Sequence, residues 1–176
     1  MQASLDGLPW IAIVGPPNVG KSLLFNRLTG SYVSVSNYPG TTVEISTGKM
    51  KLPCCGQYAG VVDTPGMFSL FPITEEERVA RHILLQERPW AVVSVIDAKN
   101  LERMLPLTLQ LLEADLPLLL ALNLLDEAED LGLEIDANAL ERRLGVPVTG
   151  TVAATGRGIP VLLRRIKGFF HADCCL

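Results

Sequence analysis

A glycine-rich segment near the N-terminus carries side chains suited to phosphate chemistry. Residues 15–22 read Gly-Pro-Pro-Asn-Val-Gly-Lys-Ser, which matches the G-x-x-x-x-G-K-[ST] spacing of a phosphate-binding loop. Glycines in such a loop let backbone N–H groups surround phosphate oxygens. Lys21 is expected to reach the β- and γ-phosphates, and the Ser22 hydroxyl to hold Mg²⁺. The predicted nucleotide contacts in this segment are Gly15, Asn18, Val19, Gly20, Lys21, Ser22 and Leu23.

The identity of the base is predicted from a second motif, Asn123-Leu124-Leu125-Asp126. A carboxylate at position 126 can accept hydrogen bonds from the ring N1–H and the exocyclic amine of guanine. Adenine would present a lone pair there, and a buried acceptor left unpaired costs about 1–3 kcal/mol. Asp126 is therefore the predicted guanine-reading residue and Asn123 its orienting neighbour, although the same pair could instead cap a helix. Leu124 stands where GTPases usually have a lysine along the base, so modest affinity is expected.

Two further segments are predicted to face the γ-phosphate. Asp63 begins an Asp-Thr-Pro-Gly motif at the end of an apolar run, and its carboxylate is expected to bind Mg²⁺ through water. The N–H of Gly66, which has no side chain in the way, is expected to approach the phosphate. The polar stretch 31–43 contains Thr41 and Thr42, and a threonine in such a loop can close over Mg²⁺ when a γ-phosphate is present.

A small-residue loop at 152–158 is the last predicted piece of the site. It reads Val-Ala-Ala-Thr-Gly-Arg-Gly. Its small side chains would let a backbone N–H of Ala153 or Ala154 reach the guanine oxygen. Small glycine-rich loops are common, so this segment gains its meaning from the other motifs.

Four longer blocks extend beyond general GTPase motifs. They are residues 37–44, 63–70, 74–81 and 95–103, the first reading Asn-Tyr-Pro-Gly-Thr-Thr-Val-Glu. With these blocks, the chain resembles the cytosolic G domain of a FeoB-type ferrous iron transporter from Ile11 to about Ile166.

The resemblance implies a P-loop GTPase fold that uses GTP and GDP, with Mg²⁺ and K⁺ as cofactors. It favours Thr42 over Thr41 as the switch threonine. It also implies that Asn18 helps to hold K⁺. The catalytic residues expected on this basis are Lys21, Asn18, Thr42 and Gly66; the Mg²⁺ ligands are Ser22, Thr42 and Asp63; the K⁺ ligand is Asn18.

A physical argument supports a cation at Asn18. Met67 follows Gly66, and a thioether cannot orient water as the usual glutamine does. Charge that builds on the phosphates must be stabilised electrostatically, and a monovalent cation could stand where an arginine finger would. The chain also departs from the resembled pattern. Pro16 lacks an N–H that could bind phosphate, and the pair Ala153-Ala154 lacks a hydroxyl often found there.

The order of apolar and helix-like segments predicts the architecture. A chain of 176 residues fits a single G domain, 1–176. Alternating segments predict an α/β fold with helices on both faces of a mostly parallel six-stranded sheet that has one antiparallel edge strand. The predicted strands are 10–14, 43–52, 58–62, 90–96, 117–123 and 146–151; the predicted helices are 21–29, 74–86, 101–114, 127–131, 136–144 and 159–170.

Composition narrows the compartment and the partners. The apolar runs are shorter than the ~20 residues that span a bilayer, and no signal peptide is evident. The formal net charge of −4, with no basic block, gives no support for a nucleic-acid partner. The pairs Cys54-Cys55 and Cys174-Cys175 lack common zinc-site spacing and are expected to be reduced thiols.

The sequence is compatible with three functions. The first is a slow, K⁺-stimulated GTPase switch that regulates ferrous iron transport at the cytoplasmic face of the inner (plasma) membrane. The resemblance then implies a helical regulatory region and a membrane transporter domain as partners, both absent from this soluble chain, and a possible homo-oligomer. The second is a non-catalytic guanine-nucleotide sensor. The third is a free-standing soluble assembly GTPase, which the acidic charge argues against.

Overall fold

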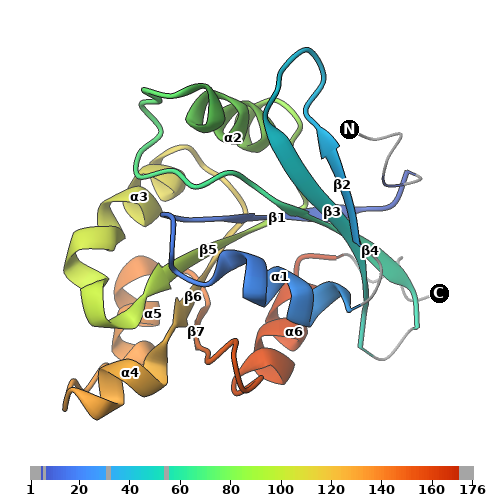
Figure 1. Cartoon of the computed structure of the whole chain (residues 1–176). Helices are drawn as coiled ribbons and strands as arrows, with labels where there is room; N and C mark the ends of the chain where they lie inside the picture. Colours follow the sequence, from blue (N-terminus) through green and yellow to red (C-terminus); the bar gives the residue numbers. More distant parts are fainter. Residues whose placement is uncertain (1–4, 6, 31–32, 54–55, 171–176) are drawn as a thin grey trace.

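A seven-stranded sheet forms the centre of the computed structural model, which describes residue 5 and residues 7–30, 33–53 and 56–170. The strands lie in the order β2-β3-β4-β1-β5-β6-β7 (Figure 1). The strands are β1 Trp10–Val14, β2 Val33–Asn37, β3 Glu44–Lys51, β4 Tyr58–Asp63, β5 Ala91–Asp97, β6 Leu118–Asn123 and β7 Val148–Gly150. The α-helices are α1 Lys21–Thr29, α2 Glu75–Leu85, α3 Leu101–Glu113, α4 Leu125–Asp130, α5 Ala137–Leu144 and α6 Ile159–Lys167, and a 3₁₀ turn, η2, covers Ala98–Asn100.

The predicted fold class is confirmed, with one difference in the strand count. Strands β1, β4, β5, β6 and β7 pair in parallel, whereas β3 runs against both of its neighbours. The sequence pattern predicts six strands and a loop over 31–43. The added strand β2 lies inside that stretch and pairs only with β3. All five of its residues are exposed, so it has no buried face to give a core-strand signal.

Helices cover both faces of the sheet. Along β1 the side chains alternate: Ile11 and Ile13 join the core under α1 and α6, while Ala12 and Val14 join the core under α2 and α3. A third cluster packs β6 and β7 against α4 and α5. Burial on both faces explains why the central strands are continuous apolar runs. Among the described residues, no helix is both long and apolar enough for a membrane span.

The parallel strands deliver the predicted motifs to one edge of the sheet. The carboxyl ends of β1, β4, β5 and β6 lie together, and each leads into a loop. The phosphate loop follows β1, Asp63 ends β4, and Asn123 ends β6. Ligands of open α/β sheets bind at this edge.

Candidate functional site

The loop between β1 and α1 is shaped by two glycines. Gly20 has a left-handed φ of 83°, and a Cβ there would lie 2.4 Å from the side-chain nitrogen of Asn123. A Cβ on Gly15 would lie 2.1 Å from the carbonyl oxygen of Val95. Both approaches are too close for any side chain. The spacing of the motif therefore reflects close packing of its backbone against β5 and β6, and this packing leaves the loop's other face to a ligand.

Lys21, Ser22 and Asp63 meet at the start of α1. The Ser22 hydroxyl donates to Asp63 Oδ2 at 2.8 Å, and the Lys21 ammonium donates to the carbonyl of Pro16 at 3.1 Å. Burial lowers the pKa of Lys21, and the negative charge of nearby Asp63 partly offsets this decrease. Burial raises the pKa of Asp63, and the hydrogen bond from Ser22 and the charge of Lys21 partly offset this increase. The three side chains come together as predicted.

The same cluster offers oxygen ligands that suit Mg²⁺. Asp63 Oδ1 is buried and has no hydrogen-bond partner among the described residues, while the hydroxyl of Ser22 already points at the other carboxylate oxygen. Mg²⁺ prefers oxygen ligands and keeps several waters. The residues present therefore fit a Mg²⁺ site that a nucleotide would complete.

Gly66 lies against the phosphate loop. A Cβ on Gly66 would come within 3.1 Å of the backbone nitrogen of Pro17. The next residue, Met67, donates its N–H to the carbonyl of Gly15 at 3.1 Å and buries its side chain completely. The position that often holds a water-orienting glutamine is thus occupied by a core side chain.

Asn123 connects the two halves of the site. Its side chain is fully buried. The amide nitrogen donates to the carbonyl of Val19 in the phosphate loop at 2.9 Å. The amide oxygen accepts from the Ala153 N–H at 3.0 Å and from the Thr151 hydroxyl at 3.2 Å. The side chain of Asn123 therefore joins the phosphate loop to the loop that contains Thr151 and Ala153, while its predicted role beside Asp126 stays a prediction.

Asp126 lies in the first turn of α4, beyond the end of β6. The N-cap of this helix is Leu124, which has a left-handed φ of 58° and makes no side-chain capping bond. Asp126 Oδ1 is buried and has no hydrogen-bond partner in the described part of the chain. The carboxylate is therefore placed as an acceptor that a ligand can use.

The two switch threonines have different environments. The hydroxyl of Thr41 donates to the carbonyl of Tyr38 at 2.9 Å and accepts from the Val43 N–H at 3.2 Å. Thr42 is exposed beside it. Asn18, in the phosphate loop, is also exposed and has a left-handed φ of 63°. The turn thus uses the hydroxyl of Thr41 and leaves that of Thr42 accessible to a ligand.

Glu77 holds both the start of α2 and the loop before it. The side chains of Thr74 and Glu77 form a capping box at the N-terminus of this helix. The Glu77 carboxylate also accepts from the N–H of Ile73 at 2.8 Å and of Phe68 at 3.4 Å. These hydrogen bonds lower the pKa of Glu77, and the bond from Ile73 has the largest effect. One carboxylate therefore fixes the loop between β4 and α2, which no sequence motif indicated.

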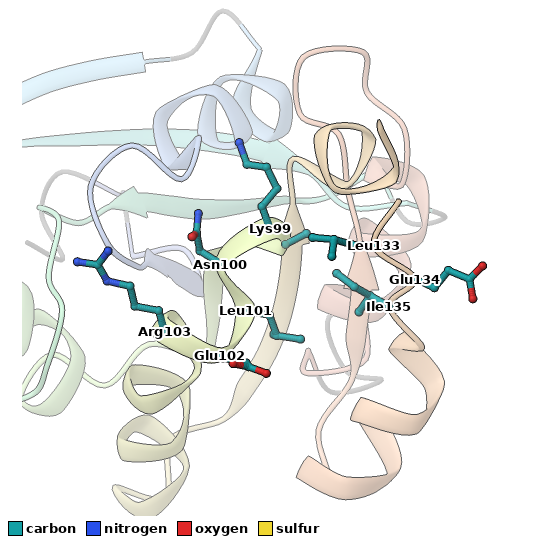
Figure 2. A pocket seen from close by; sticks show the side chains of 9 residues that line it. Lys99, Asn100, Leu101, Glu102, Arg103, Leu133, Glu134 and Ile135 are labelled. Atoms are coloured by element: carbon teal, nitrogen blue, oxygen red, sulfur yellow. The ribbon is translucent and has the colours of Figure 1, made fainter. Parts of the chain in front are cut away.

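A pocket of about 390 Å³ lies beside α4, between residues 98–103 and residues 133–135. Figure 2 shows Leu133 and Ile135 on one side of it and Asn100 and Arg103 on the other. Lys99, which also lines the pocket, pairs with Glu127 of α4. None of the predicted site residues lines this pocket in the described structure. The pocket therefore adjoins the candidate site without belonging to it.

The predicted cysteine pairs and the start of the switch stretch lie outside the described residues. These are Cys54, Cys55, Cys174 and Cys175, together with residues 31 and 32. The expectations about their chemistry stay predictions.

Comparisons with known proteins agree with this geometry. A family model described as Ferrous iron transport protein B matches residues 10–166. The Fe(2+) transporter FeoB of Staphylococcus aureus (strain COL) is 42% identical over 155 residues, which are 88% of this chain and 23% of that protein. The chain therefore spans about a quarter of the length of this relative.

Solved structures share the fold. The cytosolic domain of the T. maritima FeoB iron transporter in its GMPPNP form has a TM-score of 0.87 and 37% identity, covering 92% of this chain and 64% of that one. The FeoB G-domain from Methanococcus jannaschii has a TM-score of 0.79 and 43% identity, covering 90% of this chain and 95% of that one.

The role of Asn123 can be tested with Asn123→Asp. A carboxylate cannot donate to the Val19 carbonyl, so two oxygens would face each other in a buried place. We expect the free energy of unfolding in urea to fall by about 2–3 kcal/mol. Asn138→Asp, on the exposed face of α5, is the matched control and should change it by less than about 0.5 kcal/mol. Equal effects of the two variants would contradict the role of Asn123 in joining the two loops.

The contact between the switch loop and α2 predicts an alkaline titration. The Tyr38 hydroxyl donates to Glu87 at 3.1 Å, and the ring makes an edge contact with His82. Burial of the Tyr38 hydroxyl, its hydrogen bond to Glu87 and the negative charge of Glu87 together raise the pKa of Tyr38 to about 12. Between about pH 10, where a free tyrosine titrates, and this value, the folded chain keeps a proton that the unfolded chain loses. The stability that this contact contributes is thus intact below about pH 10 and is lost as pH rises further.

Ultraviolet titration of phenolate should therefore show a late component that belongs to Tyr38. Tyr38→Phe should remove that component, and Tyr58→Phe, at an exposed strand end, should leave it in place. A late component that persists in Tyr38→Phe would show that the assignment is wrong.

Proposed function

The chain belongs to the ferrous iron transport protein B family, and from that premise we propose that it is a guanine-nucleotide switch domain. It binds GTP and GDP with Mg²⁺, hydrolyses GTP slowly, and regulates ferrous iron transport across the cytoplasmic membrane. The chain is one G domain, and its partners are the helical regulatory and membrane portions of a full-length transporter.

A single observation carries this proposal. Three side-chain atoms of the described residues are buried without a hydrogen-bond partner, and two of them are carboxylate oxygens of Asp63 and Asp126. Buried acceptors are normally paired, because an unpaired one costs free energy. Asp63 lies at the phosphate end of the site and Asp126 at the base end. A guanine nucleotide with Mg²⁺ would supply partners to both.

The roles within the site follow from the chemistry of each group. The Lys21 ammonium and the loop N–H groups bind phosphate oxygens, and Asp126 accepts from guanine. Bound Mg²⁺ would supply positive charge to the β- and γ-phosphate oxygens, and Ser22, Thr42 and Asp63 would hold it. Thr42 suits this role because its hydroxyl is free of the turn that occupies Thr41.

Hydrolysis needs a source of electrostatic stabilisation other than a glutamine. Met67 is buried, so the proposed source is K⁺ held by Asn18 together with the phosphates. Asn18 supports this role by its exposed position at the tip of the phosphate loop. The T. maritima relative has been solved in a GMPPNP form, which supports the nucleotide class.

A second candidate is a sensor that binds guanine nucleotides without useful turnover. The buried Met67 favours it. The two candidates share the site and differ only in whether phosphate is released, so one experiment separates them.

Phosphate release should be measured with GTP and Mg²⁺ in KCl and in NaCl. The wild-type chain should be at least about tenfold faster in KCl, equivalent to about 1.4 kcal/mol of transition-state stabilisation. Asn18→Ala should lose this difference, whereas the matched control Asn138→Ala should keep it. Equal wild-type rates in the two salts would exclude the K⁺ role. Phosphate release no faster than in buffer without protein, in both salts, would favour the non-catalytic sensor.

The guanine-reading role of Asp126 predicts a change of base preference. Asn at this position can donate to the carbonyl that xanthine carries in place of the guanine amine. Asp126→Asn should weaken GDP binding by about 10- to 100-fold, which corresponds to 1–3 kcal/mol, and should favour xanthosine diphosphate. Asp130→Asn, exposed at the end of the same helix, should leave both affinities unchanged. An unaltered preference in Asp126→Asn would show that another group reads the base.

A further inference from the structure

Arg27 reaches from α1 to the loop predicted to read the guanine oxygen. Its Nε donates to the carbonyl of Ala153 at 2.8 Å, and its Nη2 donates to the carbonyl of Ala154. Helices α1 and α6 pack together (Figure 1), which brings Arg27 beside the loop that leads into α6. Arg27 belongs to none of the sequence motifs.

The guanidinium fixes the direction of one peptide. The carbonyl of Ala153 and the N–H of Ala154 belong to the same planar trans peptide bond and point in opposite directions. Because Arg27 draws the carbonyl toward α1, the N–H of Ala154 is turned away from α1. Charge-assisted bonds from a planar guanidinium are directional as well as strong, so this orientation is well defined.

The neighbouring N–H groups are already paired. The Ala153 N–H donates to Asn123 Oδ1 at 3.0 Å, and the Thr155 N–H donates to the carbonyl of Val152 at 3.2 Å. The Ala154 N–H has no acceptor among the described residues. Across residues 153–157 of the described structure, the Ala154 N–H is thus the backbone donor left for a ligand, and Arg27 determines where that donor points.

The far end of the loop is tied to the helix that carries Asp126. Arg157 forms a bidentate ion pair with Glu129 of α4, and both nitrogen–oxygen distances are 2.7 Å. Val152 and Arg157 also pair across the loop as an isolated bridge. The free N–H of Ala154 is therefore held in a set position relative to the acceptor Asp126.

We propose that Arg27 is a positioning residue for base recognition, which turns the Ala154 N–H toward the oxygen at position 6 of a bound guanine. This inference rests on the proposed function. The loop has alanines where related GTPases often place a hydroxyl. Arg27 supplies from α1 the orientation that the loop's own side chains cannot provide.

The test compares GDP with 6-thio-GDP in the presence of Mg²⁺. The sulfur analogue keeps both groups that Asp126 reads and replaces only the position-6 oxygen with a weaker acceptor. The wild-type chain should bind GDP about tenfold more tightly than 6-thio-GDP. Arg27→Ala should weaken GDP about tenfold but 6-thio-GDP less than threefold, so the preference is largely lost. Arg27→Lys keeps the charge but not the planar guanidinium, so its preference for GDP should lie between those of the wild-type chain and Arg27→Ala.

The controls separate positioning from general stability. Arg143→Ala, on the exposed side of α5, should keep the wild-type preference. If Arg27→Ala weakens both nucleotides equally, Arg27 acts on the fold alone and the inference is wrong. If Arg27→Ala does not fold, Arg27→Lys decides, because an unchanged preference in that variant would overturn the inference. Failure of the wild-type chain to bind any guanine nucleotide would instead overturn the proposed function.

Discussion

The buried amide of Asn123 is the interaction on which the rest of the site depends. It lies at the end of β6, where the parallel strands deliver their loops to one edge of the sheet. Its nitrogen holds the phosphate loop through Val19, and its oxygen holds the base-side loop through Ala153. A neutral side chain with a donor at one end and an acceptor at the other can satisfy both loops without burying a charge.

The site contains buried charge that the protein alone does not satisfy. Burial shifts the pKa of Lys21 downward and that of Asp63 upward, so each environment disfavours the ionised form. A polyphosphate would offer Lys21 an anionic partner, and a divalent cation would do the same for Asp63. The unfavourable burial of these two groups can be offset at a binding site, because a ligand that binds only the folded state adds to the stability of that state.

The segments that would respond to a γ-phosphate are attached to α2. Tyr38 at the start of the switch turn reaches Glu87 and His82, and Glu77 holds the N–H groups of the loop after Gly66. A movement of either segment would therefore change contacts made by α2 or by the residues just after it. The second of these segments also carries the exposed side chains of Phe68, Phe71 and Ile73.

Local spacing and apolar runs were enough to predict the phosphate loop, the places of Asp63 and Asn123 at strand ends, and the order of the helices and of the strands other than β2. The contacts of Arg27, Asn123 and Glu77 depend instead on how distant parts of the chain pack together. Arg27 and Ala153 are 126 residues apart, and no local pattern encodes which side chains meet across such a distance. Strand β2 was missed for the opposite reason: it is local but fully exposed, so its pairing with β3 rests on backbone hydrogen bonds that leave no core pattern.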